Sequence, residues 1–177
     1  MITVAGAIPR YRHYAYGGLH VAAMAAMVVP AMTGVFDYLP KSTFGGPGAR
    51  TLMREWARMV LTGRPPYAVD QPINTPTLVI SLGNDALSPL KAVDDVARLF
   101  SPASVTRWHH TSDQVPEGST NDHIGWVRTP ATVVDHIVTW WHGTPRSRAA
   151  ALTHTIHLKE TPCRPFSAPA DRSPTSS

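Results

Sequence analysis

Two side chains of this sequence, Asp85 and His123, have the types and settings that acid–base chemistry needs. Asp85 stands in GNDALSP, directly after the apolar run TLVISL, and His123 stands in the polar segment TSDQVPEGSTNDHIGW. In a hydrolytic site an imidazole takes a proton from a nucleophile, while a buried carboxylate fixes the tautomer of the imidazole and stabilises its cation. The two residues are 38 positions apart (123 minus 85), so only the fold can bring them together.

Each of the two residues also has a purely structural interpretation. Aspartate in a Gly-led turn bonds its own backbone, so Asp85 is equally typical of a turn former. His123 is compatible with a capping or loop histidine. Asp122 is a poor substitute for Asp85, because the side chains of neighbouring residues usually point apart. The pair therefore carries more information than either member alone.

The segments around these residues predict an alternation of helices and strands. Apolar periodicity, Pro and Ser/Thr at the starts and Gly at the ends predict helices, and short β-branched runs predict strands. A short strand is expected at the N-terminus. The later elements are expected as a helix in 47–63, a strand at 75–82, a helix in 88–100, a strand at 104–110 and a helix in 129–143. This order indicates an α/β fold with a parallel sheet, in which functional residues gather at the carboxyl ends of the strands.

Several side chains receive a specific place in these elements. Ser88 is expected as the N-cap of a helix with Pro89 at its first position, and Asp94 and Asp95 on its solvated face. Trp56 is expected as a core contact of the 47–63 helix.

Composition limits the classes of partner. The chain has 177 residues, 43% of them hydrophobic and 16% charged, which is enough for a globular core. Of the net charge of +4, residues 1–144 contribute +1 (11 Lys and Arg, 10 Asp and Glu) and residues 145–177 contribute +3 (5 and 2). The basic excess thus lies mostly in the tail, and without a basic stripe in the main part we expect no nucleic-acid partner.

The stretch from Leu19 to Phe36 is uncharged and 18 residues long, which is the lower limit for a membrane span. It is rich in Ala and Met and is interrupted by Pro30 and Gly34, so it favours a buried or cap helix over a membrane helix. The N-terminus lacks the pattern of a secretory signal, and a cytoplasmic location is the expectation.

Metal and cofactor sites have little support in the sequence. The single cysteine, Cys163, excludes an intramolecular disulfide, and the His109–His110 and His154–His157 pairs have no third ligand at convincing spacing. No glycine pattern matches a phosphate-binding loop. We therefore expect no metal and no cofactor.

The segments PTLVISLGNDALSP and NDHIGWVR, separated by a helix and a strand, resemble the C-terminal half of the α/β-hydrolase fold. FDYLPKSTFGG with MREWARMVLTGR is similar to the cap segment of a group of bacterial predicted α/β-hydrolases, at about residues 17–68. The resemblance covers about residues 1–142, within a domain expected at residues 1–143, and implies a serine hydrolase acting on an ester or related acyl bond. It implies that Asp85 is the triad acid and His123 the triad base, in the chain order of that fold.

The sequence departs from this family at the nucleophile. The family places its serine in a G-x-S-x-G turn, and no such pattern occurs in the 177 residues. The chain then corresponds to a truncated hydrolase that is inactive alone, through a natural truncation, a misassigned start or a frame change. The alternatives are a non-catalytic interaction protein that self-associates through an exposed sheet edge, and a small membrane-associated protein anchored by residues 19–36. Residues 144–177 contain five prolines and are expected to be a disordered tail.

Overall fold

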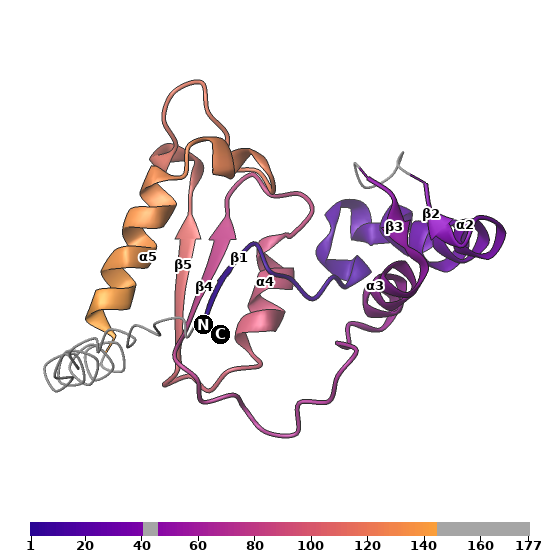
Figure 1. Cartoon of the computed structure of the whole chain (residues 1–177), viewed down its shortest axis with the longest axis horizontal. Helices are drawn as coiled ribbons and strands as arrows, with labels where there is room; N and C mark the ends of the chain where they lie inside the picture. Colours follow the sequence, from indigo (N-terminus) through magenta and orange to yellow (C-terminus); the bar gives the residue numbers. More distant parts are fainter. Residues whose placement is uncertain (41–45, 145–177) are drawn as a thin grey trace, which may run out of the picture. The chain divides into compact units, whose positions relative to one another are not determined.

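The computed structural model describes residues 1–40 and 46–144 of the chain (Figure 1). By its internal contacts the chain divides into two compact units, residues 1–140 and 141–177. The first unit contains the sheet and nearly all of the helices described below. The predicted disordered tail lies outside the described residues, apart from Thr144.

Three parallel strands form the main sheet, in the order β1-β4-β5. β1 is Ile2–Val4, β4 is Thr77–Leu82 and β5 is Val105–His110. All six residues of β4 are buried, as expected for a central parallel strand covered on both faces. The predicted α/β class is confirmed at this level: a parallel sheet with helices.

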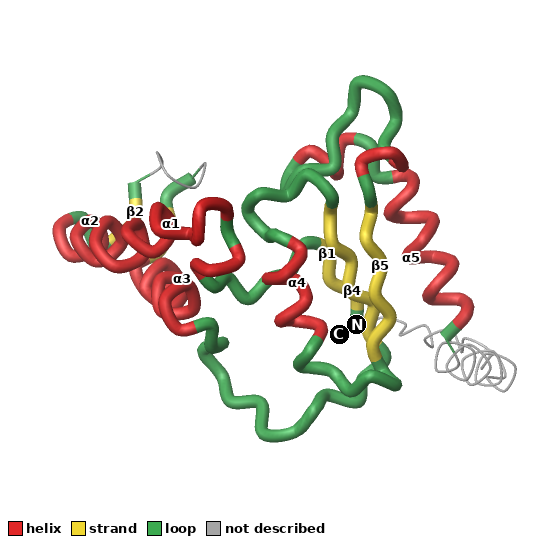
Figure 2. Tube along the Cα trace, turned by 180° about the vertical axis from the view of Figure 1, so that it is seen from behind, coloured by secondary structure: helices red, strands yellow, loops and turns green. Residues whose placement is uncertain are grey.

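Helices cover both faces of the sheet, which gives three layers (Figures 1 and 2). Leu78, Ile80 and Leu82 of β4 share a core cluster with Val133 of α5 (Ala131–Gly143). Val79, one position out of phase, packs with Val93 and Ala97 of α4 (Leu90–Ala97). The period-two alternation of side chains along β4 thus supplies one apolar face to each helix.

The chain between β1 and β4 forms a mainly helical segment, which we call the helical segment, residues 11–62. Its elements are the 3₁₀ turns η1 (Tyr11–His13) and η2 (Ala15–Gly18), α1 (Leu19–Ala23), the π-helical turn η3 (Met24–Val28), α2 (Val29–Val35), the two-stranded pair β2 (Tyr38–Leu39) and β3 (Gly48–Ala49), and α3 (Arg50–Thr62). Figure 2 shows the first helices lying beside α3. The core of the segment is formed by Val21, Ala25, Val29, Leu39, Met53, Ala57 and Val60.

The helical stretch from Ala15 to Val35 is long and apolar enough to cross a membrane, with a mean hydropathy of 1.6. Only 28% of its most apolar window is buried, and Leu19 and Val35 are largely exposed. Core helices of soluble proteins and signal sequences reach such values as well. The predicted buried helix therefore has a substantial exposed face.

Two local predictions are corrected, and a third, the core contact of Trp56, is confirmed. Pro89, not Ser88, is the N-cap of α4, because the Pro89 carbonyl accepts the first helical hydrogen bonds, from the amides of Ala92 and Val93. Asp94 and Asp95 are only partly exposed, since Asp94 pairs with Arg107 and Asp95 pairs with Arg98 and His13. Trp56 packs against the core of the helical segment but is only partly buried, and it also lines a cavity.

Candidate acid–base site

The loop after β4 fixes Asp85 with backbone hydrogen bonds. The Gly83 amide donates to the His110 carbonyl at 2.9 Å, which joins the ends of β4 and β5. The Asp85 Oδ1 atom accepts from the amides of Leu87 (2.9 Å) and Ser88 (2.8 Å). Asp85 is therefore the turn former that its residue type predicts, and this function uses only one of its two oxygens.

The loop after β5 positions His123 through the two residues that precede it. Asn121 is fully buried, and its Nδ2 donates to the His110 carbonyl at 2.7 Å. The Asp122 Oδ1 accepts from the amides of Gly125 (2.7 Å) and Ile124 (3.0 Å) at the start of the 3₁₀ turn η5 (Gly125–Arg128). These bonds, that from Gly125 first, lower the pKa of Asp122. Asp122 is thus occupied with its own loop, in agreement with its exclusion as the acid.

The two loops bring Asp85 and His123 into direct contact. The Nδ1 atom of His123 lies 2.8 Å from Asp85 Oδ2, a normal hydrogen-bond distance. The Asp85 side chain is fully buried, whereas 38% of the His123 side chain is exposed. A carboxylate that also accepts two backbone amides is an acceptor, so Nδ1 is the donor and the proton sits on Nδ1. This contact is the geometry that the sequence pair required.

Ser88 lies beside the imidazole, but on the wrong side to be the nucleophile. Its Oγ is 3.4 Å from the Nδ1 atom of His123, the same nitrogen that bonds Asp85. A nucleophile must deliver its proton to the other nitrogen, Nε2. Within residues 1–40 and 46–144, Nε2 of His123 has no hydrogen-bond partner. The acid–base pair is therefore assembled, and its proton-accepting atom is free in the described part of the chain.

Tyr14, from the helical segment, supports the same loop. Its hydroxyl donates to the Leu87 carbonyl at 3.0 Å, and the Leu87 amide donates to Asp85. Burial, and next the negative charge of Asp85, raise the pKa of Tyr14 to about 12. The phenol therefore stays neutral and keeps its proton for the Leu87 carbonyl over the physiological pH range.

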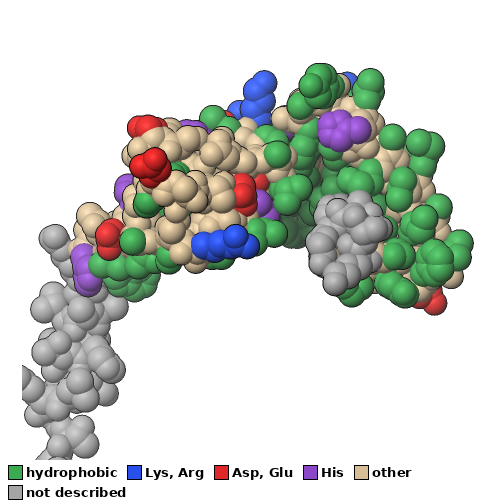
Figure 3. All heavy atoms as spheres, turned by 90° about the horizontal axis from the view of Figure 1, so that it is seen from above, with side chains coloured by type: hydrophobic (Ala, Val, Ile, Leu, Met, Phe, Trp, Pro, Cys, Tyr) green, Lys and Arg blue, Asp and Glu red, His purple; other side chains and the backbone are tan. Residues whose placement is uncertain are grey.

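A largely apolar cavity of about 770 Å³ opens beside the pair. His123, Ser88 and Leu87 line it from the sheet loops, and Met24, Met53 and Trp56 are among the residues that line it from the helical segment. In Figure 3 hydrophobic side chains line the recess between these two parts of the first unit. Its size falls within the roughly 300–1,000 Å³ of small-molecule sites.

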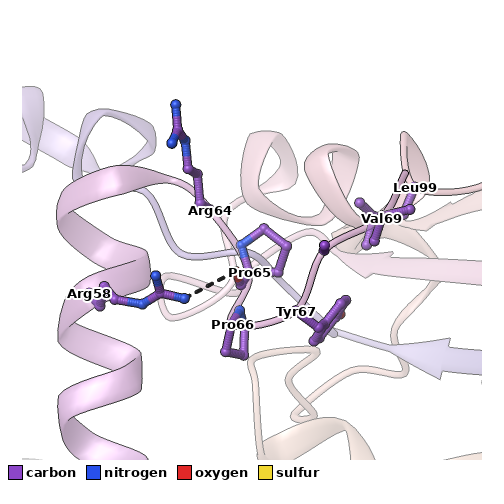
Figure 4. A pocket seen from close by; sticks show the side chains of 8 residues that line it. Arg58, Arg64, Pro65, Pro66, Tyr67, Val69 and Leu99 are labelled. Atoms are coloured by element: carbon purple, nitrogen blue, oxygen red, sulfur yellow. Dashed lines mark hydrogen bonds between the residues drawn. The ribbon is translucent and has the colours of Figure 1, made fainter. Parts of the chain in front are cut away.

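A second cavity, of about 460 Å³, lies between α3 and the segment that follows it. Figure 4 shows Arg58 reaching from α3 toward Pro65, with Tyr67 and Leu99 further along the wall. Arg58 Nη2 donates to the Pro65 carbonyl at 3.3 Å, and Arg58 also pairs with Glu55. This cavity contains neither an acid–base pair nor a histidine among its lining residues, so its arginine is accounted for as a structural contact.

The sequence alone singled out Asp85 and His123, but not the residues that hold their loops in place. Tyr14 is one of three tyrosines in YRHYAY, and nothing in that pattern distinguishes it. Asn121 could have been noted as an amide beside the histidine in NDH, but its burial depends on the position of β5. Within the described residues, no group of three His, Cys, Asp or Glu side chains could hold a metal ion.

No family model matches the chain, and no curated protein or solved structure is significantly similar to it. The geometry of the site and the sequence pattern are therefore the basis for a functional assignment.

Proposed function

We propose that this chain supplies the base and its carboxylate partner to a serine-hydrolase-type site, in a sheet of the α/β-hydrolase kind. The reaction is hydrolysis of an ester or a related acyl bond. One observation carries the proposal: the 2.8 Å contact between His123 Nδ1 and the buried Asp85 carboxylate, at the carboxyl ends of two adjacent parallel strands. Ligand and catalytic sites of parallel α/β sheets gather at that edge.

In this mechanism Nε2 of His123 acts as the base. It accepts the hydroxyl proton of the nucleophile as the hydroxyl oxygen bonds to the acyl carbon. The same proton passes to the leaving alcohol oxygen when the bond between the acyl carbon and that oxygen breaks. Water then repeats both steps on the acyl intermediate and releases the carboxylic acid. Asp85 is a positioning residue: it holds the Nδ1 proton and stabilises the imidazolium cation.

The nucleophile itself is proposed to come from a polypeptide segment other than these 177 residues. The sequence has no G-x-S-x-G turn, and Ser88 lies on the Nδ1 side of the imidazole. Without the nucleophile, acid and base have no hydroxyl to activate, and the loss of one triad member costs several orders of magnitude in rate. We therefore expect negligible hydrolase activity from the chain alone.

The tautomer of His123 tests the pair directly. Long-range ¹H–¹⁵N correlation spectra of the full chain are expected to show a protonated Nδ1 and an unprotonated Nε2 in the neutral ring. In Asp85→Asn the side-chain amide can present a donor to Nδ1, so the neutral ring is expected to shift toward the Nε2–H tautomer. An Nε2–H tautomer in the unaltered chain would overturn the assignment of Asp85 and His123.

A fluorophosphonate probe tests the source of the nucleophile. The unaltered chain is expected to remain unlabelled. Labelling that disappears in both His123→Ala and Ser88→Ala would place the nucleophile at Ser88 and would contradict the external source. If an in-frame strand, G-x-S-x-G turn and helix precede the Met1 codon in the gene, the longer product is expected to be labelled at that serine. This labelling should depend on His123.

A non-catalytic role in protein association is the second candidate. The observation that favours it is the position of β1 at the border of the sheet, paired with β4 on one side only among the described strands. An unpaired strand edge is a template for another strand.

A further inference from the structure

The lining of the cavity beside His123 has a consistent chemical character. Apart from the hydroxyls of Tyr14 and Ser88 and the rings of His20 and His123, its lining side chains are apolar. No Lys, Arg, Asp or Glu occurs among the described residues that line it. A charged ligand placed here would lose its hydration without gaining an ionic partner from this lining, which disfavours it strongly.

Two of the polar lining residues, Ser88 and His123, lie close together. His123 and Ser88 belong to the sheet loops that form the acid–base pair, and their polar atoms are 3.4 Å apart. Met24, Met53, Met59 and Trp56 come from the helical segment. Methionine side chains are flexible and polarisable, so they adapt to alkyl chains of different shapes. The cavity therefore combines the polar groups of His123 and Ser88 with an adaptable apolar wall.

We propose that this cavity binds the acyl chain of an uncharged, apolar carboxylic ester, with the ester carbonyl toward His123 and the alkyl chain against Met24, Met53, Met59 and Trp56. The proposal rests on the proposed function, since it names the substrate class of that same site. Burial of the alkyl chain supplies the binding energy, at about 0.8 kcal/mol per buried CH₂ group. Dicarboxylic monoesters and amino-acid esters are disfavoured by the absence of a charged partner in the described lining.

The methionines of the chain offer a built-in test. Met24, Met53 and Met59 line the cavity, whereas Met27 and Met32 are exposed and do not line it. The full chain labelled with ¹³C-methyl methionine can be titrated with methyl nonyl ketone, a neutral compound that mimics the ester but cannot be hydrolysed. Saturable shifts are expected for the three lining methyl groups and not for Met27 and Met32. Shifts confined to Met27 and Met32 would indicate surface adsorption and would overturn the proposal.

Charge selectivity is tested with a matched ligand and matched variants. The keto acid of the same chain length, with a carboxylate at the far end, is expected to bind at least about tenfold more weakly than the ketone. Leu52→Lys places a cation in the lining at a position that is 66% exposed, so the variant is expected to fold. It should weaken binding of the ketone and reduce the difference in affinity between the ketone and the keto acid. Leu61→Lys, on the same helix but outside the lining, is the control. It should change neither the affinity for the ketone nor the difference in affinity between the two ligands. Equal affinity for both ligands would overturn the proposed substrate class.

The two proposals can fail separately. If the ketone does not bind while His123 keeps its Nδ1–H tautomer, the substrate class is wrong and the acid–base pair remains. If the ketone binds while His123 has the Nε2–H tautomer, the cavity is real and the hydrolase assignment fails.

Discussion

At the scale of single residues, the site depends on the two oxygens of the Asp85 carboxylate making different hydrogen bonds. Oδ1 of Asp85 closes its own loop, and Oδ2 holds the imidazole. The two interpretations of Asp85 that its sequence allows, turn former and partner of a base, are therefore compatible. The loop bonds fix the direction of the second oxygen, and a fixed direction is what a positioning residue needs.

Tyr14 gives the molecule a pH dependence at this same scale. Its pKa is raised from 10.0 to about 12 in the folded chain. Between these two values the unfolded chain loses the phenol proton and the folded chain keeps it, so rising pH favours unfolding. The stabilisation is complete below about pH 10 and is lost by about pH 12.

Tyr14→Phe is expected to remove this component. The difference in the free energy of unfolding between the unaltered chain and the variant should shrink between pH 10 and 12, by on the order of 1 kcal/mol, because solvent screens a partly buried group. Urea unfolding at a series of pH values measures it. A difference in the free energy of unfolding that stays constant between pH 10 and 12 would contradict the raised pKa. Tyr16→Phe, at a 94% exposed position, is the control.

At the scale of elements, the ends of β4 and β5 set the distance between acid and base. Leu82 and His110 are paired in the register, and the His110 carbonyl accepts from both the Gly83 amide and the Asn121 side chain. One carbonyl oxygen thus ties the loop that carries Asp85 to the loop that carries His123. A Cβ atom at Gly83 would lie 3.3 Å from Asn121 Nδ2 and 3.3 Å from this oxygen, so a larger residue there requires these neighbours to shift by a few tenths of an ångström.

Asn121→Ala is expected to loosen the loop that carries His123. The loss of the bond to the His110 carbonyl should cost about 1 kcal/mol of stability, because Gly83 still satisfies that oxygen. In the same variant, the fraction of His123 with a protonated Nδ1 should fall. Urea unfolding and ¹H–¹⁵N spectra measure the two effects, with Ser119→Ala in the same loop as the control. An unchanged tautomer would show that Asn121 does not position His123.

Most of the elements could be predicted from the sequence, because their signals are local. The strand at 75–82 and the helix that ends at Gly63 follow from residue type, apolar period and glycine stops. α4 begins one residue later than the Ser-Pro pattern predicts, because the Pro89 carbonyl accepts the first helical hydrogen bonds. Trp56 was expected as a core contact of α3, but together with Leu52 and Met59 it also lines the cavity. Apolar residues look the same in sequence whether they face a core or a ligand, so the cavity required the structure.

At the scale of the whole molecule, the border of the sheet is the feature with the widest consequence. Met1 and Ala5 direct backbone groups toward β4, so alternation directs the amides of Ile2 and Val4 away from it. A strand pairing with this border would extend the sheet without disturbing the existing hydrogen bonds. Both the separate segment proposed to carry the nucleophile and a second copy of the chain could use it.

We expect the isolated chain to self-associate through this border. Its average mass in sedimentation experiments should rise with concentration. Val4→Pro, which removes one outward amide and keeps an apolar side chain, should lower the association. Unfolding curves of the variant show whether its fold is retained. The control is Val134→Lys, at an exposed position of α5, because a proline at that position would break the helix. A chain that stays monomeric at all concentrations would exclude this association.

The origin of the cavity walls has a consequence for how such a protein can change. Asp85, Ser88 and His123 come from loops of the sheet, while Met24, Met53, Met59 and Trp56 come from the helical segment. In the proposed function, proton transfer and substrate selectivity therefore belong to separate stretches of the gene. Exchange of the stretch for residues 19–62 by recombination would alter which molecules are accepted and leave the proton-transfer residues in place. If the proposed function holds, recombination can therefore change the ligand preference while Asp85 and His123 stay unchanged.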